Sequence, residues 1–329
     1  MRSLSLLLIL SLIAILSQPT FSKSVRCHPQ DKKVLLKIKQ HFNNSYDFSS
    51  WNPDTDCCTW YIAKCDRLTN RITIFDLKTA DDVAGPIPDA IGDLSHLTSL
   101  TFHKLPNLIG TIPPAITKLT NLQSLTITWT NVSGPIPPFL SQLKNLTGLS
   151  LSFNKLTGSI PPSLAKLRLL ESLFLDRNRL TGSIPEAFGD IPASLTYIDL
   201  SHNQLSGEIP KGWSGFNFEY LRLERNRLDG DASGLFGKSK SIWKVDLSRN
   251  MFAFDLTKVE IPDSLKYLDM NHNKIFGSLP AGLEPLSSLN VSYNRLCGRI
   301  PTGGVFQEMD YSSFFHNKCL CGPPLPECK

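Results

Sequence analysis

The chain has no cysteine between positions 65 and 297 and no long hydrophobic run after its first 22 residues. A transmembrane helix needs about 20 consecutive apolar residues, so we expect no membrane-spanning segment downstream of the N-terminus. The sequence also lacks a G-x-S-x-G motif, a Cys/His nucleophile signature and any Cys/His quartet with zinc spacing. No linker or low-complexity tract interrupts it. These absences argue against common hydrolases, structural zinc domains and a multidomain chain.

The first 22 residues are predicted to be a secretory signal peptide. Arg2 is the positive n-region, residues 4–16 form the apolar core, and Thr20 and Ser22 precede a cleavage site at Lys23. The alternative is a membrane anchor, but the apolar core is too short to span a bilayer. We therefore expect a soluble, extracellular mature protein.

Net charge is small and diffuse. The formal charge is +5, and loss of Arg2 with the signal peptide lowers it to +4. A nucleic-acid partner would require a concentrated basic stripe, so none is expected. Local basic clusters still leave an acidic cell-wall polysaccharide open as a ligand.

The cysteines form two groups of four, one at each end of the chain. In a secreted protein an even number predicts disulfides, and we favour sequential pairing, although four cysteines allow three pairings in each group. A zinc site is not expected, and neither is any other cofactor. The two groups are Cys27, Cys57, Cys58 and Cys65, and Cys297, Cys319, Cys321 and Cys328.

Between the cysteine groups a Gly-x-Ile-Pro unit returns every ~24 residues, preceded each time by an L-x-L-x-x-N stretch. The clearest copies start at Gly110, Gly134, Gly158, Gly182 and Gly207. This period predicts an α/β solenoid: a right-handed leucine-rich repeat superhelix of about ten repeats, with a parallel concave sheet and a disulfide-bonded cap at each end. Solenoids present long concave surfaces, so the repeat favours recognition over catalysis.

The predicted organisation is an N-terminal cysteine-rich cap at 23–70, repeats at 71–296 and a C-terminal cap at 297–329. A helix is expected near residues 31–39 with Asp31 as its cap, and Trp51 and Trp60 are expected to pack it onto the first strand.

Within a repeat, the paired leucines are predicted to point inward and the asparagine to bond to the turn backbone. The proline segment should give an extended convex stretch with a second short sheet. The convex side should be irregular where the Ile-Pro pair is lost, near Gly230 and Phe254.

Residues that alternate with the inward leucines are predicted to face solvent on the concave sheet. They form an aromatic zone of Trp129, Phe153 and Phe174. A zone of arginine and lysine side chains follows it and ends at Lys266. Exposed aromatics and arginines are typical of protein-binding hot spots. The candidate partner-binding residues are Lys104, Thr128, Trp129, Ser152, Phe153, Phe174, Asp176, Arg177, His202, Arg222, Glu224 and Arg225.

A catalytic role has little support. Asp199, Asp246 and Asp269 resemble the paired carboxylates of glycoside hydrolases. On an open face beside arginines, however, nothing is expected to raise the pKa of one of them. His202 and His272 lie three repeats apart, roughly 14 Å at the usual strand spacing, which is too far to share a metal ion.

Four N-x-S/T sequons are candidate glycosylation sites in a secreted chain. They begin at Asn43, Asn131, Asn145 and Asn290. A glycan at Asn290, in the last strand, would restrict the binding face to earlier repeats.

The Gly-x-Ile-Pro repeat is similar to the plant extracellular type of leucine-rich repeat. The two caps resemble a more specific family. The segments 51–61 (WNPDTDCCTWY), 297–304 (CGRIPTGG) and 316–322 (HNKCLCG) resemble the polygalacturonase-inhibiting proteins of plant cell walls, as do the length and repeat number. The resemblance covers the whole mature chain.

This resemblance implies sequential disulfides and inhibition of fungal endo-polygalacturonases, with insect enzymes a further target class. The chain itself is expected to be a monomer. The concave face would cover the substrate cleft of the enzyme. Family members also bind homogalacturonan (pectin) through basic residues, here Arg177, Arg225, Lys244 and Arg249. The same scaffold serves relatives that interact with other proteins in floral development and a relative that binds ice, so a receptor- or peptide-binding partner and an ice-binding protein remain the alternatives.

Overall fold

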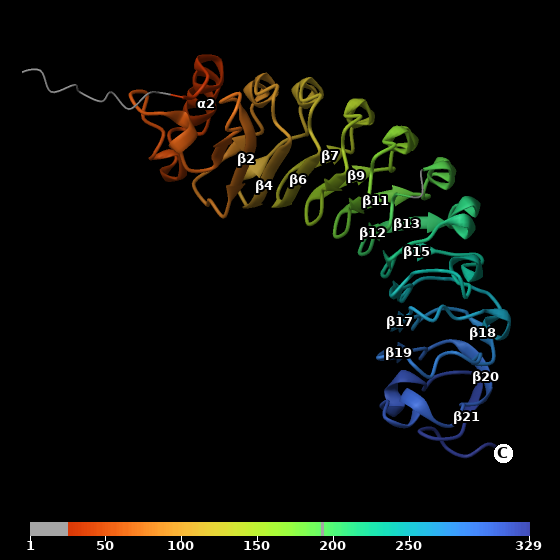
Figure 1. Cartoon of the computed structure of the whole chain (residues 1–329). Coiled ribbons are helices and arrows are strands. Elements are labelled where there is room, and N and C mark those ends of the chain that lie inside the picture. Colours follow the sequence, from red (N-terminus) through yellow and green to blue (C-terminus); the bar gives the residue numbers. More distant parts are fainter. Residues whose placement is uncertain (1–25, 192–193) are drawn as a thin grey trace, which may run out of the picture.

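The computed structural model describes residues 26–191 and 194–329. The predicted signal peptide, residues 1–22, lies outside the described residues. The described chain winds into a curved arc in which each repeat is one coil, with the N-terminal cap at one end and the C-terminal cap at the other (Figure 1). No helix in these two stretches is long and apolar enough to cross a membrane.

The inner, concave side of the arc carries an 11-stranded sheet. Neighbouring strands are parallel, except that β1 and β2 are antiparallel. The short strands contribute one inward leucine, isoleucine or valine each, and these stack from coil to coil. In order, the strands are β1 (Ala63–Cys65), β2 (Ile72–Lys78), β4 (Ser99–Leu105), β6 (Ser124–Thr130), β8 (Gly148–Ser150), β10 (Ser172–Phe174), β12 (Tyr197–Asp199), β14 (Tyr220–Arg222), β16 (Lys244–Asp246), β17 (Tyr267–Asp269) and β19 (Ser288–Asn290).

A second, five-stranded parallel sheet lies beside the first, as expected from the proline segments. It ends at β15, and the next convex strand, β18, pairs with β20 and forms a single isolated bridge to Asp255. Between them lie the degenerate repeats near Gly230 and Phe254, so the predicted irregularity is confirmed. The strands are β7 (Ser133–Pro135), β9 (Lys155–Gly158), β11 (Arg179–Gly182), β13 (Gln204–Gly207) and β15 (Arg227–Leu228), with smaller sheets of β3 (Gly85–Pro86) and β5 (Leu108–Ile109), and of β18 (Phe276–Gly277), β20 (Arg295–Arg299) and β21 (Cys319–Cys321).

Short 3-10 helices connect the strands on the outer side of the arc. Several begin with proline, whose fixed φ suits the first position of a helix and whose missing N–H costs nothing there. The regular ones are η3 (Asp89–Asp93), η4 (Pro114–Lys118), η5 (Pro138–Gln142), η6 (Pro162–Lys166), η7 (Glu186–Asp190) and η8 (Lys211–Gly215), followed by η9 (Ser233–Leu235) and η10 (Leu256–Lys258); the caps add η1 (Tyr46–Phe48), η2 (Cys57–Thr59), η11 (Gly304–Gln307) and η12 (Tyr311–Ser313).

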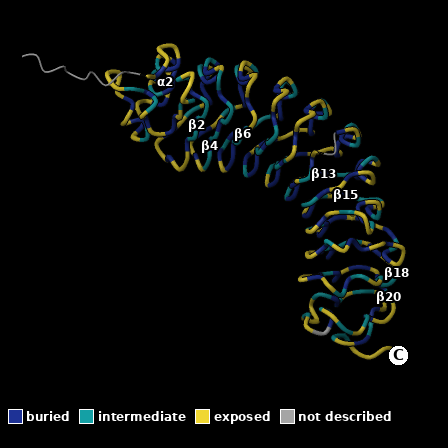
Figure 2. The backbone as a smooth tube through the Cα atoms, viewed as in Figure 1, coloured by how far each residue is buried: buried dark blue, intermediate teal, exposed yellow. Residues whose placement is uncertain are grey.

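The hydrophobic core runs through every coil between the two faces (Figure 2). A column of asparagines, called the ladder, completes it by bonding to the turn backbone. The ladder consists of Asn154, Asn178, Asn203, Asn226, Asn250, Asn273 and Asn294. In Asn203, Nδ2 donates to the carbonyls of Leu175 (3.0 Å) and Leu200 (3.1 Å), and Oδ1 accepts from the N–H of Leu180 (3.0 Å). The predicted structural role of this column is confirmed.

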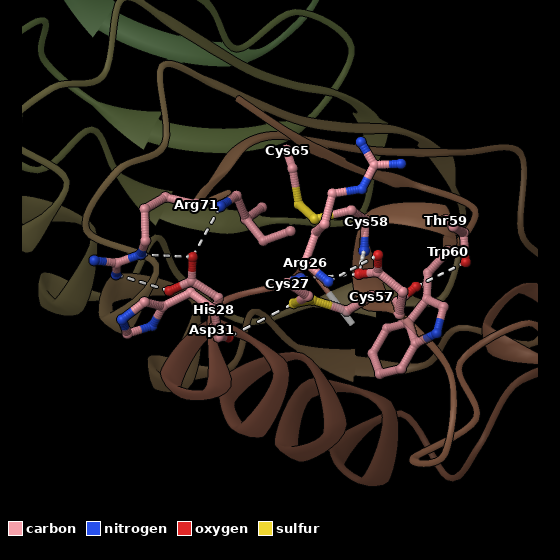
Figure 3. The surroundings of a disulfide bond; sticks show 12 residues. Arg26, Cys27, His28, Asp31, Cys57, Cys58, Thr59, Trp60, Cys65 and Arg71 are labelled. Carbon is pink, nitrogen blue, oxygen red and sulfur yellow. Dashed lines mark hydrogen bonds and ion pairs between the residues drawn. A yellow bond between two sulfur atoms is a disulfide. The ribbon is translucent and has the colours of Figure 1, made fainter. Parts of the chain in front are cut away.

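The N-terminal cap contains the single long helix of the described chain, α2 (Pro29–His41). Asp31 was expected to cap it, and this was wrong: the cap is His28, whose Nδ1 accepts from the N–H of Gln30. Asp31 is buried instead and forms a two-pronged ion pair with Arg71, which lies 40 residues away (Figure 3). Local spacing cannot reveal such a distant partner.

Aromatic side chains join this cap to the first strands. Trp51 is fully buried, lies 5.4 Å from the ring of Trp60, and contacts Phe75 of β2 at 6.3 Å between centroids. The Nζ of Lys39, on α2, donates to the Trp51 carbonyl. The two tryptophans therefore connect helix and sheet as predicted.

The four disulfides follow the sequential pairing. They are Cys27–Cys57, Cys58–Cys65, Cys297–Cys319 and Cys321–Cys328, so each end of the stack is cross-linked twice. In the N-terminal cap, Asp56 also accepts hydrogen bonds from the N–H groups of Arg26 and Cys27.

Candidate functional site

One row of the concave face consists of residues with left-handed backbone. Each lies immediately before the ladder asparagine, or before its equivalent in the first repeats, and all have φ between 53° and 56°, although none is glycine. A non-glycine residue in this region costs about 1–2 kcal/mol, so the conformation is imposed by the turn. We call these residues the αL row: Lys104, Trp129, Phe153, Arg177, His202, Arg225, Arg249, His272 and Tyr293.

At the N-terminal end of the αL row, two aromatic rings stack face to face. The centroids of Trp129 and Phe153 are 3.7 Å apart and their planes differ by 13°. The guanidinium carbon of Arg177 lies over the Phe153 ring, 4.9 Å from its centroid. Trp129 keeps 48% of its surface exposed. The structure thus brings three of the predicted binding residues together as one exposed aromatic–cation stack.

Phe174, the third member of the predicted aromatic zone, lies in another row. It is half-buried on β10, paired in register with Ser150 and Asp199. This middle row continues through Arg222 of β14 and Asp246 of β16.

A third row was expected to face solvent, and this was wrong. Thr128, Ser152, Asp176 and Glu224 are each less than 10% exposed. Alternation predicts the direction of a strand side chain but ignores its neighbours in the next coils, only about 4.8 Å away. These residues bond to neighbouring side chains instead: Thr128 Oγ1 with His103 Nδ1 at 2.8 Å, and the Ser152 hydroxyl with the Asp176 carboxylate.

Arg222 is the centre of a half-buried charge network. It forms ion pairs with Asp199, at 3.2 Å, and with Glu224. Burial, and then the charge of Asp246, raise the pKa of Glu224 to about 7, and burial raises the pKa of Asp269 to about 6. The expectation that no carboxylate here has a raised pKa is therefore wrong, because packing between neighbouring coils removes these carboxylates from much of the water.

His202 shows the opposite shift. Burial, together with the neighbouring Arg177 and Arg225, lowers its pKa to about 4. Its Nε2 lies 3.9 Å from the carboxylate of Glu224. The imidazole is therefore neutral at mildly acidic and neutral pH.

A fourth row, which was not predicted from the sequence, lies at the other end of the strands. In register along β12, β14, β16 and β17 stand Tyr197, Tyr220, Lys244 and Tyr267. Trp243 adds its ring, with centroids 5.8 Å from Tyr220 and 5.9 Å from Tyr267. These five residues are called the rim row. The signal was present in the sequence, since an aromatic residue precedes the first inward apolar residue in these repeats.

The predicted basic set is divided between two rows. Arg177, Arg225 and Arg249 are exposed members of the αL row, whereas Lys244 belongs to the rim row. The middle row separates them.

The four sequons differ in their surroundings. Asn43 and Asn145 are exposed, and Asn131 and Asn290 are half-buried. Nδ2 of Asn131 donates to the Pro106 carbonyl at 2.6 Å. Glycosylation at the four sites stays a prediction.

Comparison with known protein families identifies the repeats. A family model described as "Leucine rich repeat N-terminal domain" matches residues 28–66, and models described as "Leucine rich repeat" match residues 145–167, 170–228 and 264–286.

Similarity over the full length of the chain identifies more specific relatives. The chain is 53% identical to "Polygalacturonase inhibitor 2" of Arabidopsis thaliana, with 100% of this chain and 99% of the relative covered. It is 54% identical to "Polygalacturonase inhibitor" of Vitis vinifera, covering 97% and 96%. Among solved structures, a plant ice-binding protein superposes with a TM-score of 0.90 at 47% identity, covering 92% of this chain and 99% of that one.

Proposed function

The chain belongs to the polygalacturonase-inhibitor family of leucine-rich repeat proteins, and we propose that it is itself a secreted inhibitor of fungal endo-polygalacturonases. Its target would be bound by the concave face, which would cover the pectin-cleaving cleft and so serve plant defence. The observation that carries the proposal is identity above 50%, over the full length, to proteins named as inhibitors of this enzyme.

The concave face supports binding by contact with a protein. The stack of Trp129, Phe153 and Arg177 combines two aromatic residues and an arginine, the side chains enriched in hot spots. Folding does not need this stack on the solvent side, since the core lies on the opposite side of the sheet. Arg225 extends the same row towards the C-terminus. We assign these four residues to the contact with the enzyme.

The proposed role is inhibition rather than catalysis. The carboxylates with raised pKa, Glu224 and Asp269, lie on the surface of a continuous sheet, and Glu224 is ion-paired to Arg222. A general acid needs a free proton and room for substrate beside it. The paired, packed arrangement supports a structural and electrostatic role for these groups.

Secretion to the plant cell wall fits the four disulfides, which persist in oxidising compartments. A second ligand, homogalacturonan, fits the positive side chains on the concave face. In the cell wall, the inhibitor would then lie on the polymer that its target enzyme attacks. We expect it to act as a monomer.

The experiment that tests the proposal measures the release of reducing ends from polygalacturonic acid by a panel of fungal endo-polygalacturonases, with and without the purified mature chain. Dose-dependent loss of activity with at least one enzyme is the expected result. Absence of any effect across the panel, with a correctly folded chain, would overturn it.

The similarity to the ice-binding protein supports a second candidate, because the same scaffold carries that function at 47% identity. Ice binding requires a flat, regular array of small polar side chains. On the concave face, the exposed stack of Trp129, Phe153 and Arg177 interrupts such an array. Measurement of ice recrystallisation with the same preparation distinguishes the two, and a chain that inhibits neither process but still binds a receptor ectodomain would be a receptor partner.

A further inference from the structure

The N-terminal cap contains a hollow to which the proposed inhibition gives no role. Its volume is about 410 Å³, and it is lined by both sulfur-bearing residues of one disulfide, the half-buried Cys58 and Cys65. The other disulfide of this cap, Cys27–Cys57, is buried. Of these two bonds, Cys58–Cys65 is therefore the one that faces a space large enough for a small molecule.

Three cationic side chains line the same hollow. Arg26, Lys64 and Arg67 are exposed, and within residues 26–191 and 194–329 none of them forms an ion pair with a carboxylate. Asp56 and Asp66 also line the hollow, but both already accept hydrogen bonds from backbone N–H groups. The cations thus retain donors for a ligand. A cleft in which one sign of charge prevails concentrates ions of the opposite sign.

The surroundings of the disulfide allow it to open while the cap stays folded. Oδ1 of Asp56 accepts from the N–H of Cys27 and from that of Cys58, each at 3.0 Å, and so connects one residue of each disulfide. Cys27–Cys57 joins residues 30 apart in the sequence, whereas Cys58–Cys65 joins residues 7 apart. In the loop-entropy description the longer loop contributes more stability. Loss of the shorter cross-link therefore leaves the stronger one in place.

The two sulfurs of the disulfide differ in the charges near them. Sγ of Cys58 lies within 4.8 Å of a carboxylate oxygen of Asp56, and this negative charge repels an approaching thiolate. Cys65 directly follows Lys64 and comes two residues before Arg67. An anionic thiol that enters the hollow is therefore directed to Sγ of Cys65.

We propose that Cys65 is a modification site for a small thiol that carries carboxylates, and that the product is a mixed disulfide. The thiolate of the small molecule bonds to Sγ of Cys65, the Cys58–Cys65 bond breaks, and its electron pair leaves on Sγ of Cys58. That sulfur takes up the proton that the small thiol has lost, so no further oxidant or reductant is needed. The carboxylates of the adduct bind to the cations of the hollow. Attack by the Cys58 thiolate on the adduct reverses the step.

The test exposes the full mature chain, under native conditions, to glutathione, which has a net negative charge, and separately to 2-mercaptoethanol, which is neutral. Acid stops the exchange because it protonates the thiolates, and mass spectrometry of the peptides then locates each adduct and each free thiol. The expected product carries glutathione on Cys65 and a free thiol on Cys58. An adduct on Cys58, or one that forms only in denaturant, would overturn the proposal.

The matched control is a second disulfide in the same molecule. Cys321–Cys328 also joins residues 7 apart, but the neighbouring Arg299 is ion-paired to Glu327. The ratio of the glutathione rate to the 2-mercaptoethanol rate corrects for differences in access. This ratio should be at least about threefold higher at Cys58–Cys65 than at Cys321–Cys328. Equal ratios at the two disulfides would overturn the proposal.

A charge variant tests the role of the cations directly. Lys64→Gln combined with Arg67→Gln should lower the glutathione rate at Cys65 about threefold or more and leave the 2-mercaptoethanol rate within about twofold. High salt should have the same effect on the wild-type chain, and this arm needs no substitution that could disturb folding. A glutathione rate unchanged in both arms would contradict the proposal. Since no polygalacturonase is present, the outcome is independent of the inhibitor proposal.

Discussion

The indole of Trp129 and the phenyl ring of Phe153 lie parallel, 3.7 Å apart between centroids, on residues that share a left-handed backbone in adjacent coils. The turn fixes the backbone at both positions and the two rings pack against each other before any partner arrives, so little conformational entropy remains to be lost on binding. A preformed aromatic surface of this kind should contribute strongly to affinity.

Trp129→Ala should therefore weaken inhibition of a sensitive polygalacturonase by about 2 kcal/mol, roughly 30-fold in the inhibition constant. Addition of Arg225→Ala should weaken it further. Neither residue packs the core, so the melting temperature should change little. Ile109→Ala, which removes an exposed apolar side chain from β5 of the two-stranded sheet with β3, is the control. Full inhibition by the double variant would exclude the αL row as the contact surface.

Asn203→Ala should lower the free energy of unfolding by about 2 kcal/mol or more. The change leaves the buried N–H of Leu180 without a partner, and an unsatisfied group of this kind costs about 1–3 kcal/mol. It also removes one of the two amide donors at each of the carbonyls of Leu175 and Leu200, which keep their bonds from the neighbouring ladder asparagines. Urea unfolding measures the loss. Asn121→Ala, at an exposed asparagine with one bond to the Ser95 carbonyl, should cost less than about 1 kcal/mol. Equal losses would contradict the assigned role of the ladder.

The left-handed backbone of Arg249 can be tested separately from its side-chain contacts. Arg249→Val should lower the free energy of unfolding by about 1–2 kcal/mol, because a β-branched side chain is strongly disfavoured at positive φ. Arg249→Asn loses the same charge but tolerates this conformation, and should stay within about 0.5 kcal/mol of the wild type. If urea unfolding gave the same stability for both variants, the turn would not impose the conformation.

Stability should fall as pH rises from about 6.5 to about 8. The pKa of Glu224 is raised from 4.5 to about 7 in the folded chain, so the folded state binds more protons than the unfolded state between these values, and rising pH favours unfolding. His202, with its pKa lowered to about 4, has the opposite effect as long as the unfolded imidazole still binds protons, which extends about one pH unit above its ordinary pKa of about 6.5. A variant that changes only Glu224 therefore isolates the contribution of this carboxylate.

Glu224→Gln should flatten this dependence, measured as the urea midpoint at each pH. Arg222 would keep Asp199 as a partner in the variant. The control is Glu260→Gln, at an exposed glutamate, which should leave the profile unchanged. A wild-type chain whose stability rises over the same pH interval would show that Glu224 is not the dominant group.

The regular parts of the fold were predictable because each depends on a contact that recurs with the period of the repeat. An inward leucine meets the leucine of the next coil, and Asn203 meets the same backbone atoms that every other ladder asparagine meets. Asp31 was misassigned because its partner, Arg71, lies outside the local pattern. The degenerate repeats were correctly predicted to be irregular. Their geometry was not predictable, because it depends on which of the convex strands still pair with a strand of the next coil.

The candidate site was predicted less completely. Alternation along a strand correctly put Trp129 on the solvent side, but it could not show that Asp176 and Glu224 are buried, since their burial depends on side chains in adjacent coils. The left-handed turn was missed because its residues are not glycine. Tyr220 and Tyr267 were not predicted because they come before the first inward apolar residue of their repeats, although their spacing from that residue is constant.

The αL row has a consequence for how such a protein changes over generations. Its backbone cost is nearly the same whether the residue is lysine, tryptophan, phenylalanine, arginine, histidine or tyrosine, all of which occupy it here. Exchange of one for another alters what the surface recognises while folding stability stays nearly constant. Selection can therefore explore new targets one codon at a time, without passing through unfolded intermediates.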